Sequence, residues 1–458
     1  MNEVNNKRFY FWGIGNLGEG FIAIITSTYL AIFLTDVALL PIQIVSAILL
    51  ITSISDLVLS PLCGAIISAV KPMKWGRLRS WLLVGPPIAT IFYILQFTTI
   101  PNNNYLTATI IIIGFVVAKI AWTLTHTANI SLMNVLSTDF QGRNKLSSQL
   151  MIGSNAGRLI GNYLTPVIIA ILLSNFKERY AYIILMLIAG IIYITTLWVH
   201  FYITKGSEDT NQADLGKTYN TEKQLTLREM FKCLSTNGNL LQIILIDMTS
   251  NVTSLALPSL AVYYYKYVFQ NYSLVPTHML CIGLAGILGA LITRYTSKFV
   301  KSKKVYLCTT YLLISIALFC TRFVSNSPYL FIGINIIIHM LSGTTQPYEL
   351  GFYADNVIYT KWKTLESANS LIMGISILPL KLATVIKSVL ISTVLMSGGY
   401  VANVKPTIEF QHVLINAYSL IPASIAILGF IILGFIYKLS DEKVKEMKVE
   451  IDKRENQK

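Results

Sequence analysis

Long apolar runs separated by short polar segments recur along the whole chain. A helix needs about 20 residues to cross a hydrocarbon core of about 30 Å. About twelve of the runs reach that length. They lie near residues 11–35, 42–70, 80–100, 105–136, 148–174, 181–203, 240–268, 275–297, 304–324, 329–350, 368–397 and 410–437. The pattern therefore predicts an all-α integral membrane protein with about twelve transmembrane helices.

One long polar stretch, at residues 205–239, divides the predicted spans into two groups of about six. The chain then has an N-terminal six-helix half at 1–203, a central cytoplasmic loop at 204–239, a C-terminal six-helix half at 240–437 and a cytoplasmic tail at 438–458. This organisation resembles the major facilitator fold, in which the substrate site lies near the middle of the membrane between the halves.

Composition and charge support a membrane protein and argue against a nucleic-acid partner. Of the 458 residues, only 13% are charged, whereas soluble domains carry about 25%. The net charge is +14, with Lys and Arg gathered in loops at 71–79, 143–145 and 298–304 and absent from 36–41 and 98–106. The loops alternate in this respect, so the positive-inside rule places both termini in the cytoplasm. The basicity then reflects topology and attraction to anionic lipid.

The chain contains no pattern that would supply an enzyme with its reactive groups. The motifs GxSxG and HExxH and a phosphate-binding glycine loop do not occur. We therefore expect no enzymatic activity, no metal and no cofactor. The expected protein is a multi-pass monomer of the cytoplasmic membrane, with the lipid bilayer and a small-molecule substrate as its partners.

The second predicted span carries one formal charge, Asp56, near its centre. An acid there costs about 2.5–3.5 kcal/mol on insertion, and such residues usually mark a solute or ion path. Ser60 lies four residues later on the same helix face, so the two side chains could hold a small cation or one proton. We predict that Asp56 binds the coupling ion. The alternative is an acid that pairs with Lys or Arg of another span for assembly alone.

The fourth predicted span carries Lys119, Trp122 and His126, spaced three and then four residues apart. One helix face would then present a cation, an aromatic ring and a titratable imidazole. A ring between polar groups suits a sugar, whose C–H face is apolar while its hydroxyls need hydrogen bonds. We predict substrate binding at all three and proton coupling at His126. Alternatively, Trp122 packs in the core and Lys119 extends to the membrane surface.

The fifth predicted span carries Arg158, a second candidate for substrate binding. A buried arginine needs an acidic partner, and Asp56 and Glu19 are both candidates. Gly157 and Gly161 lie on a neighbouring stripe of the same span, which favours close packing against another helix.

Two further spans carry candidate substrate residues. Asp247 and Asn251 align at helical spacing in the seventh span, where they form either a substrate contact or a structural hydrogen-bonded stripe. Lys381 in the eleventh span lies far from both predicted ends, so its amine cannot reach the membrane surface easily. This position favours a role in binding or in a buried ion pair.

Four charged residues are candidates for a gate. The segment "QPYELGFYADN" places Glu349 and Asp355 at the predicted cytoplasmic end of the tenth span, where they could pair with a basic loop. Arg77 and Arg79 lie in the basic loop after the second span.

Several short segments together resemble the glycoside-pentoside-hexuronide:cation symporter family, which includes melibiose permease, and the similarity runs nearly end to end. They are "GIGNLGEGF", "YLAIFLTDV", "KWGRLRSWLLVG", "LAVYYYKYVF", "YADN" and "YKLSDEKVKEMKVEI". The resemblance implies the major facilitator fold and symport of a sugar or glycoside with a cation.

The cation-binding residues of that family are only partly present. Asp56 matches the first acid of the family's D-x-x-x-D-P pattern in the second span, whereas the second acid is Ser60 here. The family's first-span acid falls at Gly20, beside Glu19, and its fourth-span acid falls at His126. Sodium prefers several oxygen ligands, so the reduced set favours a proton as the coupling ion.

The substrate residues carry over unevenly as well. Lys381 matches the family's eleventh-span lysine, but the fifth-span arginine falls at Met151, with Arg158 two turns further along. The leading hypothesis is a proton-coupled sugar or glycoside symporter that works by alternating access. One alternative is a transporter of an anionic solute or modified peptide, since the spans hold more bases than acids. Another is a sensor or partner protein of the same fold that has lost transport.

Overall fold

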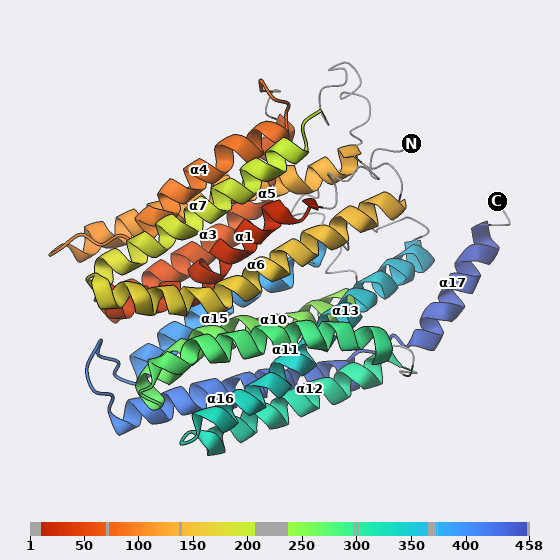
Figure 1. Ribbon diagram of the computed structural model, residues 1–458. Helices are drawn as coiled ribbons and strands as arrows, with labels where there is room; N and C mark the ends of the chain where they lie inside the picture. Colours follow the sequence, from red (N-terminus) through yellow and green to blue (C-terminus); the bar gives the residue numbers. More distant parts are fainter. Residues whose placement is uncertain are drawn as a thin grey trace. The chain divides into compact units, whose positions relative to one another are not determined.

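The structure, a computed structural model, describes residues 11–69, 73–136, 140–206, 237–296, 299, 302–364, 372 and 374–455. These residues form helices, and the one β-type pairing among them is an isolated bridge between Met73 and Gly76. Eleven helices in the described residues are long and apolar enough to cross a membrane. A further helix, α4 (Arg79–Gln96), corresponds to the predicted third span and contains Pro86 and Pro87. The expected all-α plan with about twelve spans is confirmed (Figure 1).

The chain divides into two compact units. One comprises Met1–Asn220, Val275–Leu280 and Tyr400–Val404, and the other comprises Thr221–Leu274, Cys281–Gly399 and Lys405–Lys458. Residues 207–236, most of the predicted central loop, lie outside the described residues.

The helices that precede the central loop follow the predicted spans closely. They are α1 (Ile14–Ile24), continued by η2 (Ile25–Tyr29), α2 (Leu30–Ile32) and η3 (Phe33–Val37), then α3 (Ile42–Ala69), α4, α5 (Asn104–Leu136), α6 (Phe140–Asn175) and α7 (Glu178–Ile203). The helix α5 packs against α3 and α4, and α1 packs against α6 and α7.

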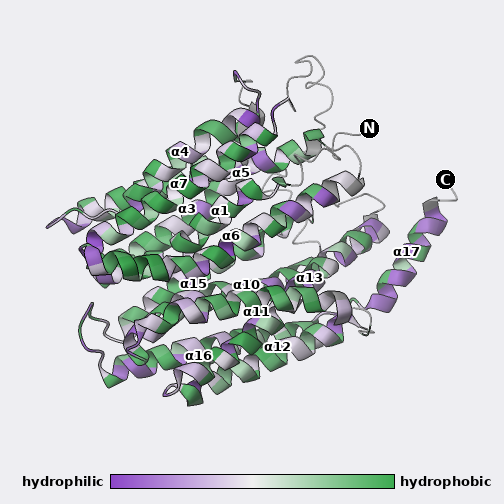
Figure 2. Ribbon diagram, viewed as in Figure 1, coloured by the Kyte–Doolittle hydropathy of each residue, from purple (hydrophilic) through white to green (hydrophobic). Residues whose placement is uncertain are grey.

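The helices that follow the loop are mostly apolar, with one exception. They are α10 (Gly238–Tyr263) with η4 (Tyr264–Val268), η5 (Tyr272–Leu274), α11 (Val275–Thr296), α12 (Lys303–Cys320) with η6 (Thr321–Val324), α13 (Pro328–Thr364), α15 (Leu378–Ser397), α16 (Ile408–Ile431) with η7 (Ile432–Ile436), and α17 (Asp441–Glu455). The helix α10 packs against α13, α15 and α16. The exception is α17, which is mainly hydrophilic (Figure 2).

The tenth and eleventh helices depart most from the predicted spans. The helix α13 continues past the predicted end at residue 350 to Thr364. The helix α15 begins at Leu378 instead of residue 368, after a turn at Ser376 and Ile377. Pro379 occupies its first turn, where the missing N–H of proline costs nothing. This shift changes which lysine lies in the middle of the eleventh helix.

The first and seventh spans end in the same way. In each, a five-residue π-helical turn, η3 or η4, is followed by an N–H that bonds the carbonyl five residues earlier, at 2.8 and 3.1 Å. Two residues after each turn a non-glycine residue has positive φ, 51° at Leu39 and 50° at Gln270. Such residues are uncommon, so the shared geometry is a specific structural repeat.

Glycines bring the backbones of α1 and α6 into direct contact. A Cβ added at Gly157 would lie 2.8 Å from the carbonyl carbon of Leu17, and one at Gly161 would lie 3.3 Å from the carbonyl oxygen of Phe21. The predicted close helix packing at these glycines is confirmed. A Cβ at Gly20 would collide with the carbonyl oxygen of Ser154. The contact therefore leaves no room for an acid at position 20.

We predict that Gly157→Ala destabilises the protein by about 1–3 kcal/mol, because the added methyl group must separate the two backbones. Thermal unfolding of the purified protein in detergent measures the effect. Gly333→Ala in α13 is the matched control, since no atom lies within 4 Å of the added Cβ there. Equal unfolding temperatures for the two variants would contradict the packing described.

Candidate functional site

A ladder of three side chains lines one face of α5. The amine of Lys119 lies 4.4 Å from the centre of the Trp122 ring. The Trp122 and His126 rings stack, with centroids 4.9 Å apart and planes inclined by 8°. The predicted shared face is confirmed. The Lys119 amine, the Trp122 indole and the His126 imidazole therefore follow one another along this face of α5.

Each end of this ladder contacts a buried acid from another helix. The amine of Lys119 lies 3.4 Å from Oδ1 of Asp56 on α3. At the other end, Nδ1 of His126 lies 2.8 Å from Oε2 of Glu19 on α1. Asn16 also donates to that oxygen, at 3.0 Å. The acids and bases together form a continuous chain, which we call the α5 row and define as Asp56, Lys119, Trp122, His126 and Glu19.

The α5 row is suited to holding a proton. Asp56 and Glu19 are 7% and 3% exposed, so each carboxylate is stable there because a cation or hydrogen-bond donor is in contact with it. When Glu19 is ionised, Nδ1 of His126 must carry the hydrogen that joins them, which leaves Nε2 as the second protonation site. A proton can therefore bind at the imidazole or at either carboxylate.

Ser60 contributes less to this site than its spacing suggests. Its hydroxyl donates to the backbone carbonyl of Asp56 at 2.9 Å, a local bond that serine commonly makes within helices. Its predicted part in binding the coupling ion together with Asp56 stays a prediction.

Arg158 does not pair with either predicted acid. In the described residues neither Asp56 nor Glu19 forms an ion pair with it, and its side chain is exposed. The reason lies in α6, where the preceding Gly157 faces the α1 backbone and Arg158 is turned about 100° away from it. Its predicted role in substrate binding stays a prediction.

Arg79 is a structural residue inside the first unit. Its side chain is 3% exposed and donates to the carbonyl of Phe201 at 3.1 Å and to the hydroxyl of Thr204 at 3.4 Å. These partners lie at the carboxyl end of α7, where carbonyls lack helical donors and a cation is favourable. These contacts stabilise the end of α7, and a gating role for Arg79 stays a prediction. For Arg77, gating stays a prediction.

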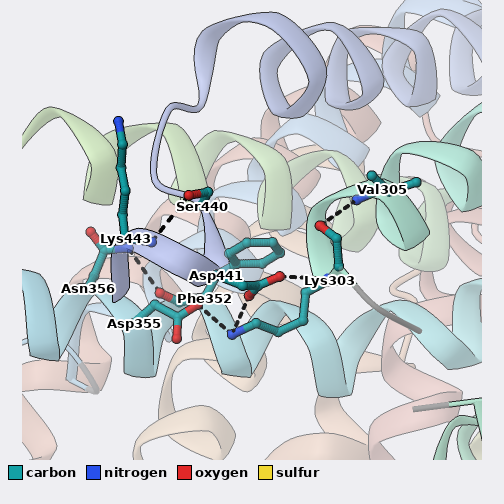
Figure 3. A network of polar contacts seen from close by, with 9 residues as sticks. Lys303, Val305, Phe352, Asp355, Asn356, Ser440, Asp441 and Lys443 are labelled. Carbon is teal, nitrogen blue, oxygen red and sulfur yellow. Dashed lines mark hydrogen bonds and ion pairs between the residues drawn. The ribbon is translucent and has the colours of Figure 1, made fainter. Parts of the chain in front are cut away.

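Asp355 pairs with a lysine of the third predicted basic loop, as expected. Oδ2 of Asp355 lies 2.6 Å from the amine of Lys303, which also lies 3.2 Å from Oδ1 of Asp441 (Figure 3). The backbone N–H of Lys303 donates to Asp441 as well, at 3.0 Å. One lysine thus joins α12, α13 and α17, and all three residues belong to the second unit.

A second set of contacts holds α17 further along its length. The indole of Trp362 on α13 donates to Glu450 at 2.7 Å, and Arg454 donates to the Trp362 carbonyl at 3.3 Å. These contacts and the Lys303 pairs explain why a mainly hydrophilic helix stays docked. We call the Lys303, Asp355 and Asp441 contacts the α17 brace.

We predict that Lys303→Gln loosens α17, because one substitution removes both ion pairs of the α17 brace. The side chains are partly exposed, so the loss is about 1 kcal/mol, or roughly fivefold faster amide exchange in α17. Hydrogen exchange with mass spectrometry measures it. Lys448→Gln, on the exposed face of α17, removes the same charge as a control. The same exchange rates in both variants would show that the brace does not hold the helix.

Glu349 lies in a different environment from the one predicted. Its Oε1 accepts the hydroxyl of Tyr311 at 2.6 Å, and it makes no ion pair with a basic loop in the described residues. Asp247 accepts Asn251 at 2.6 Å and the hydroxyl of Tyr353 at 2.9 Å. Asp247 and Asn251 therefore form a hydrogen-bonded stripe, and substrate contact by either residue stays a prediction. Glu349 is buried in the second unit, and gating at Glu349 stays a prediction.

Lys387, which the sequence analysis overlooked, is the lysine in the middle of α15. It is 7% exposed and lies halfway along the helix, whereas Lys381 is the fourth residue of α15 and only partly buried. The later start of α15 accounts for the difference. The sequence does contain a signal for it, because Lys387 is the one charged residue in the apolar run 382–396. The prediction that Lys381 lies far from both helix ends is therefore wrong.

The fold and the buried polar rows define a multi-pass membrane transporter of the major facilitator type. A family model described as "MFS/sugar transport protein" matches residues 11–441. The chain belongs to this family, and the resemblance inferred from the short segments is confirmed.

Characterised relatives are distant but match most of the chain. The isoprimeverose transporter of Lactiplantibacillus pentosus is 23% identical over 383 residues, covering 83% of this chain and 78% of that protein. A lactose permease of Lactobacillus delbrueckii subsp. bulgaricus is 23% identical over 469 residues, covering 97% and 72%. The crystal structure of a D-xylose-proton symporter shares the fold, with a TM-score of 0.68, 13% identity and coverage of 94% and 97%.

Proposed function

We propose that the protein is a proton-coupled symporter that moves a sugar or glycoside across the cytoplasmic membrane, with both termini in the cytoplasm. It works as a monomer by alternating access. The observation that carries this proposal is the α5 row, which combines an aromatic plate with two acid–base pairs on one helix face. The names of the isoprimeverose and lactose relatives support the substrate class.

The α5 row offers the two kinds of contact that a sugar needs. Lys119 and His126 both contact the Trp122 ring in this structure, so the ring can stack on the C–H face of a pyranose or furanose once the Lys119 amine moves from the ring to a sugar hydroxyl. Lys119 and His126, on either side of the indole, can bond its hydroxyl groups. An apolar plate with a few convergent polar groups is the usual composition of a small-molecule site.

The same geometry favours a proton over sodium as the coupling ion. The amine of Lys119 lies 3.4 Å from Asp56 and would repel a metal cation placed at that carboxylate. A hard cation also needs several oxygen ligands, and Ser60 directs its hydrogen bond to the backbone. A proton needs one acceptor, and binding it at Asp56 would release Lys119 to bond a sugar hydroxyl. This exchange of partners would link proton binding to substrate binding.

An anionic solute is the second candidate, and the α5 row favours it less. Each base of the row already contacts an acid, Lys119 with Asp56 and His126 with Glu19. An anion would have to compete with both carboxylates, whereas a neutral sugar can bond them without separating charge.

We predict that Asp56→Asn abolishes sugar accumulation driven by a pH gradient and keeps counterflow exchange. Asparagine retains the size of the side chain but cannot take up the coupling proton. Uptake of labelled glycosides, pentoses and uronides into proteoliposomes measures both activities. Added sodium should restore little accumulation.

Two controls accompany this experiment. Ser60→Ala, which removes a hydroxyl bonded to the backbone, should retain accumulation. Asp56→Asn with Lys119→Gln removes the unpaired amine, so it separates loss of coupling from misfolding. Accumulation by Asp56→Asn against a gradient would mean that the acid is structural. Absence of exchange with every sugar, but exchange of organic anions, would favour the second candidate.

A further inference from the structure

Two buried carboxylates lie within the second unit, away from the α5 row in the sequence and on other helices. Asp247 is the tenth residue of α10, and Glu349 lies within α13, which packs against α10. They are 8% and 3% exposed, respectively. The side chains of Tyr311 and Tyr353, which bond them, belong to an apolar cluster that also includes Ile243. Both acids therefore lie in a low-dielectric interior.

The two carboxylates differ in the hydrogen bonds that they accept. Both oxygens of Asp247 accept a neutral donor, Oδ1 from Asn251 and Oδ2 from Tyr353. Glu349 accepts one donor, the hydroxyl of Tyr311, at Oε1. Its other oxygen, Oε2, is fully buried and has no hydrogen-bond partner. An ionised carboxylate would leave a buried negative oxygen unsatisfied there, which is costly.

Hydroxyl groups next to Glu349 can accept a hydrogen from it. Ser250 of α10 and Thr345 of α13 lie beside the carboxyl group, and their hydroxyls are 3.2 Å apart. Thr345 is one helical turn before Glu349, and Ser250 is one turn after Asp247, so the four side chains lie along the contact of α10 with α13. These hydroxyls can accept a hydrogen from a protonated Oε2 or donate to an ionised carboxylate, so the absence of a nearby cation is what favours the protonated form.

No base neutralises either acid within the described residues. The titratable groups of the described helices around them are numerous: Lys303, Lys304, Tyr306, Cys308 and Tyr311 of α12, Tyr329, His339, Tyr348, Tyr353, Asp355, Tyr359, Lys361 and Lys363 of α13, Lys381 and Lys387 of α15, Glu409, His412 and Tyr418 of α16, and Asp441 of α17. Of the titratable groups in the described residues, Tyr311 and Tyr353 bond Glu349 and Asp247, respectively, and neither acid has an ion pair there. Two adjacent ionised carboxylates without a counter-charge repel each other in this interior.

We propose that Asp247 and Glu349 form a second proton-binding site, in which Oε2 of Glu349 holds the proton and Asp247 stays ionised. One O–H bond forms when a proton from water binds Glu349, and the same bond breaks on release. Tyr311 and Tyr353 orient the two carboxyl groups. That this proton is exchanged during transport rests on the proposed symport function, whereas its binding does not.

Infrared spectroscopy of the purified full-length protein tests the binding directly, without substrate. A buried protonated carboxyl group gives a C=O stretching band that disappears when the group ionises. The wild-type protein should show such a band, and Glu349→Gln should lose it. Asp247→Asn should shift the pH at which the band disappears, because it removes the neighbouring charge. A band that persists unchanged in Glu349→Gln overturns the proposal.

Two further variants keep the test decisive if Glu349→Gln does not fold. Tyr311→Phe retains both carboxyl groups and removes the donor to Oε1, so the band should move to higher frequency. An unmoved band would overturn the assignment. Asp355→Asn is the matched control, since this carboxylate is paired with Lys303 and should not contribute. Loss of the band in Asp355→Asn would also overturn the assignment.

Transport measurements then separate this site from the α5 row. In proteoliposomes, Glu349→Gln should exchange sugar but lose most of the accumulation driven by a pH gradient. His126→Gln should leave the infrared band unchanged, because His126 and Glu349 are in different units. If no sugar is transported by any variant and the band still behaves as expected, the symport proposal fails and the proton site stands.

Discussion

A charge inside a helix bundle has to be compensated by another group of the same bundle, and this constraint determines the contacts of the buried charged residues described above. The penalty for an uncompensated ion in an apolar interior amounts to several kcal/mol. In the first unit Asp56 pairs with Lys119, and Glu19 pairs with His126. In the second unit Asp355 pairs with Lys303, whereas Asp247 and Glu349 have hydroxyl and amide donors and no base in the described residues. Asp247 and Glu349 therefore differ in their chemistry from the paired acids of both units.

Compensation also explains why some charged residues are structural. Arg79 bonds the last carbonyls of α7, and Lys303, at the start of α12, joins this helix to α13 and α17. A cation placed at the carboxyl end of a helix stabilises groups that have no helical donor. Both residues come from segments rich in Lys and Arg, where charge alone does not separate a structural role from a gating role. The identity of the partner makes that distinction.

The features that depend on one helix could be predicted from the sequence, and those that depend on two could not. The length of the apolar runs is set by the membrane, so the spans followed directly. The face shared by Lys119, Trp122 and His126 depends only on helical spacing. By contrast, the contacts of Glu19 with His126 and of Glu349 with Tyr311 depend on how separate helices pack. No spacing in a single sequence records that packing.

The first and seventh spans end in the same backbone geometry, although they lie in different halves of the chain. A π-helical turn adds one residue to a regular helix, and a positive φ at a non-glycine residue is a further rare event. Both occur at the same place in two segments more than two hundred residues apart, followed by Leu39 in one and Gln270 in the other. The five-residue sequences of the two turns, FLTDV and YYKYV, share only their last residue. The same backbone path at the end of a span is therefore compatible with very different side chains.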